Sequence, residues 1–294
     1  MKKFLSLVVI ALLAISAFAQ EPKKETVIVE LFTRTGVVSN YVAEGVRNGV
    51  LQNFIEKGRF NIVDAATNAQ LQAMNANRVE TAEEVNASNV LSAETNDVYK
   101  SLGANFLIKG HVTNWSKSYV KEALTDNYTY RIEINFTLTA YRISDGSVVG
   151  TKALSLTGNN REDWEIAEQK AIGSAHFSAT SFVDEFFPFA TSIEQIEEVT
   201  KGKKPAAKTL YILGGTEMGV AKGQLFVVKQ VKQIGSRTTQ VEIGKLKAVE
   251  AMDGITKCTV TKGGAEINDV FNSQGKEALV VISAGEAFLS GLFN

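Results

Sequence analysis

The stretch YRIEINFTLTAYRI, residues Tyr130–Ile143, carries the clearest structural signal in the chain. Apolar side chains occupy every second position and polar ones fill the positions between. The apolar set is Ile132, Ile134, Phe136, Leu138 and Ala140. A period of two is typical of a strand with one buried and one solvated face. We therefore expect a half-buried antiparallel strand, followed by a turn at Ser144–Gly146 and a returning strand over Ser147–Leu156.

The residues before this strand alternate between strand and helix patterns. Strands are expected over Thr26–Phe32, Arg59–Val63 and Asn105–Gly110. A helix beginning at Ser39 or Asn40 carries an apolar stripe and stops at Gly58. The stripe is Val42, Val46, Val50, Leu51, Phe54 and Ile55. This half of the chain is predicted to be a sheet packed with helices.

One long helix is expected after Asn160, ending before Pro188. It carries a stripe of mostly small residues with a bulky end, and such a stripe allows close packing on a sheet. The stripe is Ala167, Ala171, Ala175, Ala179, Val183 and Phe186.

After Thr209 the pattern changes to short strands separated by glycines, and we find no competing helix pattern. The fold class is therefore α+β: a sheet packed with helices, followed by a small all-β barrel. We expect a signal peptide over 1–19, an α+β domain over 24–190, a linker over 191–207 and the β domain over 208–285. The linker is assigned to the polar, lysine-rich EEVTKGKKPAAK, whose charges are expected to be solvated.

The first 19 residues indicate export. Lys2 and Lys3 precede an apolar run, and Ala17-Phe18-Ala19 fits the small-x-small cleavage rule. The alternative is an uncleaved amino-terminal anchor. No cysteine lies near the cut, so we expect no lipid attachment there. Cleavage removes two lysines and makes the formal net charge of −1 more negative, which argues against nucleic acid or an anionic membrane as partner.

Few residues could carry chemistry. His111 and His176 are the two histidines and lie far apart in the sequence, so zinc has little support. Ser174 precedes His176 by two positions, and residues two apart on a helix do not face each other. Structural roles are favoured for both histidines. We expect no catalytic, cofactor-binding or metal-binding residues, no cofactor, and no enzymatic activity.

The remaining candidate motifs also favour structural roles. Cys258, the one cysteine, is expected to be a buried small hydrophobe and not a reactive thiol. The glycines at Gly214–Gly219 and Gly263–Gly264 lack the strand-to-helix context and the Lys-Ser/Thr of phosphate loops, so hairpin turns are the better interpretation.

The order of the first-half motifs resembles the curli secretion channel family, CsgG. The motifs are Phe60–Asp64, Gly103–Gly110 and Arg142–Val149, within a match over Thr26–Phe189. LpoB, an activator of a penicillin-binding protein, and the amino-terminal domain of TolB resemble the same domain. The resemblance implies a TolB-N/CsgG-like fold and a role in assembly at the outer membrane.

The second half is similar to the last domain of the flagellar assembly protein FlgT. The matching segments are Gly219–Val228 and Ile243–Val249. FlgT joins a TolB-like domain to such a β domain, so the order of the two parts here is the same.

The resulting hypothesis is a non-catalytic, exported scaffold or assembly factor for an outer-membrane or cell-surface structure, related to curli assembly. It would lie in the Gram-negative periplasm or at the outer membrane, membrane-peripheral at most. Its expected partners are proteins of the envelope, and a homo-oligomer is a further option. One alternative is an LpoB-like regulator of a peptidoglycan synthase, which the missing lipid anchor disfavours. Another is a CsgG-type channel subunit, disfavoured because fewer than 20 residues separate His111 from Tyr130 and leave little room for a membrane hairpin.

A docking surface for such partners is expected at the polar face and strand edge around Tyr130–Ile143, because open edges invite β-pairing. The competing interpretation is that this edge is covered by a neighbouring strand.

Overall fold

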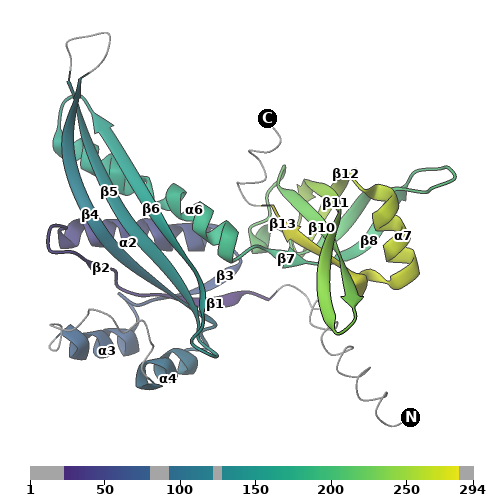
Figure 1. The fold of residues 1–294 in the computed structure, drawn as a ribbon, viewed down its shortest axis with the longest axis horizontal. Helices are drawn as coiled ribbons and strands as arrows, with labels where there is room; N and C mark the ends of the chain where they lie inside the picture. Colours follow the sequence, from purple (N-terminus) through teal and green to yellow (C-terminus); the bar gives the residue numbers. More distant parts are fainter. Residues whose placement is uncertain (1–22, 80–92, 122–127, 285–294) are drawn as a thin grey trace. The chain divides into compact units, whose positions relative to one another are not determined.

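The computed structural model describes residues 23–79, 93–121 and 128–284. The predicted signal peptide therefore lies outside the described residues. The chain divides into two compact units, Glu25–Phe186 and a second that begins at Phe187 (Figure 1).

The first unit is a mixed sheet with helices on both faces. Its strands lie in the order β3-β1-β4-β5-β6, and β2 pairs with β4 outside this path. The β3, β1 and β4 strands are parallel, and the pairs β4–β5 and β5–β6 are antiparallel. The strands are β1 (Glu25–Val29), β2 (Thr33–Arg34), β3 (Phe60–Asp64), β4 (Phe106–Lys121), β5 (Tyr128–Arg142) and β6 (Val148–Asn160). The helices are α2 (Asn40–Glu56), α3 (Ala69–Val79), α4 (Ala93–Ser101), α5 (Trp164–Gly173) and α6 (Ala175–Phe186).

The strand predicted over Tyr130–Ile143 is confirmed as β5, and its burial alternates as expected. Its apolar side chains lie on the sheet face that α5 covers, and its polar side chains lie on the other face. The expected open edge there is wrong, because β5 pairs with β4 along one side and with β6 along the other. The open edge belongs to β6 (Figure 1).

The α2 helix forms where the apolar stripe predicts it. Ser39 is the N-cap, and its hydroxyl accepts a hydrogen bond from Val42 N at 3.2 Å. Gly58 has φ of +69° directly after the helix, the conformation for which glycine is the preferred stop. Ile55 is an exception within the stripe, since it is 56% exposed.

The single helix expected after Asn160 is two helices, α5 and α6, which meet at Ser174. Asp163, and not Asn160, caps α5 by accepting from Glu165 N at 2.9 Å. The small-residue stripe is confirmed: its alanines and Val183 are fully buried. Gly158 of β6 lies so close to α5 that an added Cβ would be 1.9 Å from Ala167 O.

The second unit is a curled antiparallel sheet in the order β7-β13-β10-β11-β12-β9-β8. The two ends of this order, β7 and β8, are separated in sequence by Ser192 alone, so one chain segment pairs with β13 and then with β9. The strands are β7 (Ala190–Thr191), β8 (Ile193–Val199), β9 (Ala207–Leu213), β10 (Leu225–Ile234), β11 (Arg237–Ala251), β12 (Ile255–Lys262) and β13 (Leu279–Ser283). Short 3-10 helices lie at η1 (Thr216–Met218) and η2 (Lys276–Ala278).

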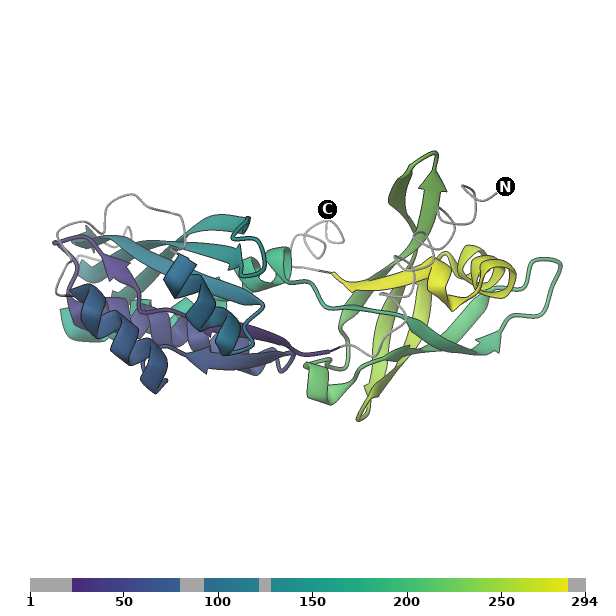
Figure 2. The same cartoon turned by 90° about the horizontal axis from the view of Figure 1, so that it is seen from below.

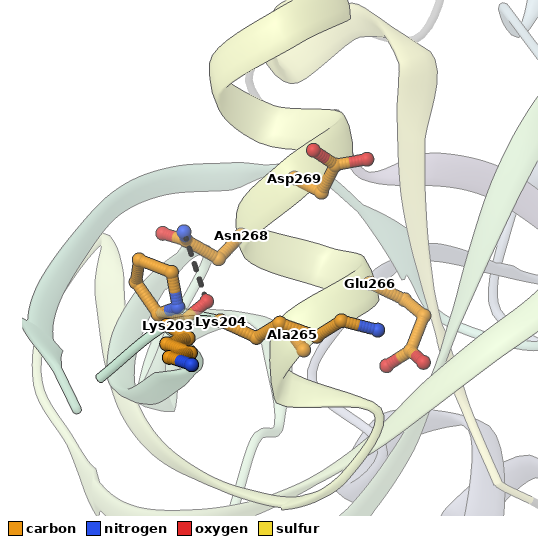
Figure 3. Close-up of a pocket in the computed structure, with 7 residues that line it drawn as sticks. Lys203, Lys204, Ala265, Glu266, Asn268 and Asp269 are labelled. Atoms are coloured by element: carbon orange, nitrogen blue, oxygen red, sulfur yellow. Dashed lines mark hydrogen bonds between the residues drawn. The ribbon is translucent and has the colours of Figure 1, made fainter. Parts of the chain in front are cut away.

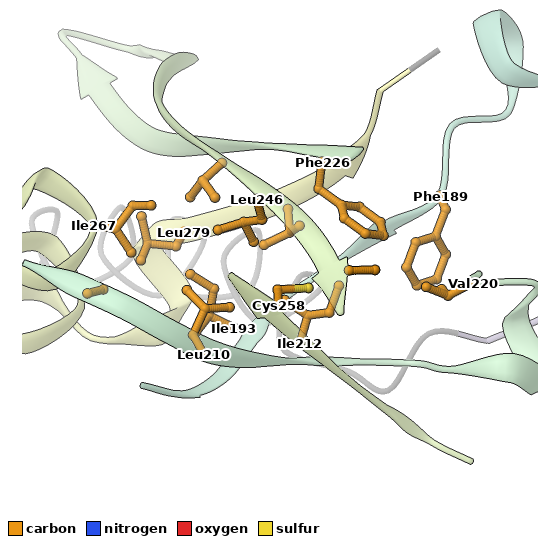
Figure 4. Packing of buried hydrophobic residues seen from close by; sticks show 14 of the residues in the cluster. Phe189, Ile193, Leu210, Ile212, Val220, Phe226, Leu246, Cys258, Ile267 and Leu279 are labelled. Carbon is orange, nitrogen blue, oxygen red and sulfur yellow. The ribbon is translucent and has the colours of Figure 1, made fainter. Parts of the chain in front are cut away.

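The concave side of this sheet holds the core of the second unit (Figure 4). Phe226, Leu246 and Cys258 lie at its centre and are inaccessible to solvent. Figure 2 shows the curled strands of this sheet from a second direction.

Two features of the second unit differ from the sequence-based expectation. The segment expected as linker, 191–207, contains β8, whose mostly exposed residues explain its polar composition. A helix, α7 (Gly264–Gln274), follows Gly263, whose φ of +75° starts the helix instead of closing a hairpin. The buried positions Ile267 and Val270, with Phe271 partly buried, show the helical spacing that marks α7.

Candidate interaction surface

His111 lies on β4, on the face of the sheet opposite α5 and α6. Its Nδ1 is 2.8 Å from the Thr33 hydroxyl, and Thr33 is its register partner on β2. The imidazole therefore joins the short β2 strand to β4.

His176 lies at the start of α6, on the other face of the sheet, and links this helix to α2. Its Nε2 is 2.7 Å from Glu56 Oε2, and its backbone carbonyl accepts from Asn53 at 2.9 Å. Hydrogen bonds from Gln52 and then from His176 hold the pKa of Glu56 below its usual value. The two histidines are thus separated by the sheet, and each has a structural partner.

Within the ranges that the structure describes, no three His, Cys, Asp or Glu side chains are grouped so that they could hold a metal ion. Cys258 is buried, and burial raises the pKa of its thiol to about 12. A thiol with so high a pKa is protonated at neutral pH and is a poor nucleophile. That the protein has no catalytic or metal site stays a prediction.

A hollow of about 390 Å³ lies in the second unit between the β8–β9 loop and α7 (Figure 3). Lys203 and Lys204 line it from the loop, and Glu266 and Asp269 line it from the helix. Asn268 joins the two sides by donating to Pro205 O at 3.2 Å. Two ammonium groups and two carboxylates balance each other, so the hollow has no net charge with which to select an ionic ligand.

The outer edge of β6 is the strongest candidate for binding. In the described residues no strand pairs with this side of β6, which is 13 residues long. Its sequence VVGTKALSLTGNN contains one charged residue and no proline. Charges, prolines and short length are the features that normally protect edge strands.

One face of β6 is fully exposed and continues the polar face of the sheet. Its side chains there are Thr151, Ala153, Ser155, Thr157 and Asn159, all exposed. They stand opposite Thr139, Thr137, Asn135, Glu133 and Arg131 of β5. The Thr151 hydroxyl donates to Thr139 Oγ1 at 3.2 Å. Next to the open edge, this face therefore carries small side chains, many of them with hydroxyl groups, and little charge.

An aromatic cluster lies near the carboxyl end of β6, on the face that α5 covers. The Tyr119 ring is 5.0 Å from Trp164 and 5.4 Å from Tyr130, measured between centroids. Lys117 Nζ lies 5.4 Å from the centroid of Trp164. Tyr119 and Tyr128 are more than half exposed, and their ring centroids lie 6.4 Å apart.

The strand edge expected around Tyr130–Ile143 lies one strand further out, at β6. The polar face around Tyr130–Ile143 exists, but β6 supplies the edge. The returning strand predicted over Ser147–Leu156 is confirmed as β6, although sequence alone does not state which strand ends the sheet.

Comparison with solved structures finds distant similarities. No family model matches the chain, and no curated protein matches it. The chain is similar to the PelC dodecamer from Paraburkholderia phytofirmans at 11% identity and a TM-score of 0.34, over 55% of this chain and 90% of that one. It is similar to lipoprotein GNA1162 from Neisseria meningitidis at 10% identity and a TM-score of 0.34, over 47% and 86%. It is similar to the LpoB C-terminal domain from Escherichia coli at 11% identity and a TM-score of 0.28, over 49% and 92%.

In the part of the chain that the structure describes, no helix combines the length and the apolar character that crossing a membrane requires.

Proposed function

We propose that this chain is an exported, non-catalytic protein of the Gram-negative envelope that acts as a scaffold or assembly factor for an outer-membrane or cell-surface structure. The observation that carries the proposal is the open edge of β6, thirteen residues long. An extended partner segment would add to this edge through main-chain hydrogen bonds, with side-chain contacts on the two faces giving specificity.

Three further observations support this function. The amino-terminal sequence has the pattern of a secretion signal. Both histidines are held in structural contacts on opposite faces of the sheet. The motif order resembles the curli secretion channel family, whose members assemble structures at the outer membrane. The protein would therefore lie in the periplasm or against the outer membrane and bind protein partners there.

The test is site-specific photo-cross-linking in living cells. A photoreactive amino acid replaces Ser155 on the edge strand, in the full-length chain expressed in its own bacterium. We expect a strong covalent adduct with a protein of the envelope, either this chain or another. The matched control replaces Thr137, which lies on the same face one strand further in, and should give little adduct because its neighbours belong to the same sheet.

The same experiment examines whether the two histidines take part in binding. Combining His111→Ala with His176→Ala should leave the adduct yield at Ser155 unchanged, provided the amount of folded protein is the same. The mass of the adduct separates a surface-assembly partner from a peptidoglycan synthase. Equal, weak adducts at Ser155 and Thr137, with the protein correctly exported, would refute binding at the β6 edge.

A further inference from the structure

We propose that the outer edge of β6 pairs in antiparallel fashion with β6 of a second copy of this chain. This rests on the proposed function, because both place protein binding at the same edge. The arrangement has a two-fold axis perpendicular to the sheet, and it joins the two mixed sheets into one continuous sheet. Since the axis is perpendicular to the sheet, the helices α5 and α6 of both copies lie on the same face.

Three pairs of positions in β6 carry like residues on the two sides of Leu154. With the axis at Leu154, Thr151 lies opposite Thr157, Ala153 opposite Ser155, and Gly150 opposite Gly158. Each pair joins two residues of similar size, and the first joins two threonines. Hydroxyl pairs and well-matched small residues are favourable across antiparallel strands. The remaining pairs are unlike: Lys152 lies opposite Leu156, and Val149 and Val148 lie opposite Asn159 and Asn160 at the two ends.

Charge also favours self-pairing. Lys152 is the charged residue of β6, and its side chain turns to the helix-covered face. There its ammonium lies 2.7 Å from Glu185 Oε2 and donates to Ser181 O at 3.2 Å. Two copies therefore meet without bringing unneutralised like charges together. The opposite edge of the sheet, β3, has five residues and ends in the ion-paired Asp64.

Side chains beside the edge are complementary under the same symmetry. Lys170 of α5 lies at the carboxyl end of β6, where its ammonium donates to Asn159 O at 3.3 Å. Glu185 of α6 lies at the other end, beside Lys152. Antiparallel pairing brings the Lys170 end of one copy next to the Glu185 end of the other, twice per dimer. Ile166, one helical turn from Lys170 and 38% exposed, lies on the same side of α5 and would be covered.

The first test measures the mass of the purified, exported full-length protein by light scattering. We expect the mass of two chains. Ala153→Glu puts two carboxylates close to the axis and should weaken the dimer about tenfold or more. Thr137→Glu adds the same charge on the same face, one strand away from the edge, and should leave the mass at two chains.

The second test checks the register through a disulfide. A chain carrying both Ala153→Cys and Ser155→Cys should form covalent dimers on mild oxidation, because these positions lie opposite each other across the axis. The native Cys258 will not interfere, since it is buried and its thiol pKa is about 12. Thr137→Cys in place of the pair is the control and should form no covalent dimer on oxidation.

The outcomes separate this proposal from the proposed function. A single-chain mass, or an assembly that gives no disulfide from the cysteine pair, overturns self-pairing. If self-pairing fails but Ser155 still cross-links a different envelope protein in cells, the proposed function stands and the edge has another occupant. If Ser155 gives no adduct either, both proposals are wrong.

Discussion

Replacing Arg47 with methionine is expected to lower the free energy of unfolding of the Glu25–Phe186 unit by about 3–5 kcal/mol. The guanidinium is 3% exposed, and it donates to Glu30 O at 2.8 Å and to Val29 O at 3.0 Å. It is also ion-paired with Asp64 at the end of β3. The Arg47 side chain of α2 thus donates hydrogen bonds to the backbone carbonyls at the carboxyl end of β1. It also neutralises the Asp64 carboxylate at the end of β3. Methionine fills the space but leaves the two carbonyls and the carboxylate without this partner.

The measurement is urea unfolding followed by tryptophan fluorescence. Trp115 and Trp164 are the two tryptophans of the chain and both belong to this unit, so their signal reports it alone. Arg142→Met is the control: Arg142 is exposed and its guanidinium lies 5.4 Å from the centroid of the Phe106 ring, so its loss should change stability by about 1 kcal/mol or less. Equal stability of the two variants would show that Arg47 does not connect α2 to the sheet in the way described.

Replacing Gly158 with valine is expected to destabilise the same unit by about 3 kcal/mol. Gly158 lies on β6 directly beneath α5, where an added Cβ would be 1.9 Å from Ala167 O and 2.4 Å from Ala171 N. Both are backbone atoms of the helix, so no side-chain rotation relieves the overlap. The α5 helix would have to move away from the sheet and expose Ile132 and Leu156, which are buried.

Fluorescence-monitored urea unfolding measures this change as well, and Trp164 at the start of α5 makes the signal sensitive to the helix. Gly36→Ala serves as the control, because no atom lies within 4 Å of its added Cβ and its φ is not positive. A Gly158→Val protein as stable as the Gly36→Ala protein would mean that α5 does not pack on β6 at this distance.

The sequence patterns that proved most informative were local ones. The alternation in Tyr130–Ile143 predicts β5 because the two faces of a strand meet different surroundings. The alanine stripe after Asn160 predicts close helix packing, and Ala167, Ala171, Ala175 and Ala179 are fully buried. Both patterns involve residues only a few positions apart, so they can be recognised in a single sequence without knowledge of the fold.

The order of strands in the sheet was not predictable in the same way. Whether β5 or β6 ends the sheet depends on pairings between β4, β5 and β6, and the backbone groups that make these pairings are the same for every residue type. The α7 helix was missed because Gly263–Gly264 is compatible with both a hairpin turn and a helix start. β8 was missed because a strand with mostly exposed residues resembles a polar linker in composition.

The candidate surface at β6 likewise combines a local feature that the sequence predicts with a property of the whole sheet that it does not predict. Its polar side chains could be predicted, since each second residue of β5 is polar. The open backbone edge could not, because it is a property of the whole sheet. The histidines show the converse: the sequence favours structural roles for both, and the structure adds that the sheet separates them.

The central claim is that the protein acts through strand addition at β6, and amide hydrogen exchange tests it most directly. The assembly is extracted gently from the envelope, and its exchange is compared with that of the separated chain. We predict slower exchange in the assembly along Val148–Asn160, with β4 and the paired interior of β5 unchanged, because a bound strand supplies acceptors to the outward amides of β6 alone. Equal exchange of β6 in the assembly and in the separated chain would contradict the account.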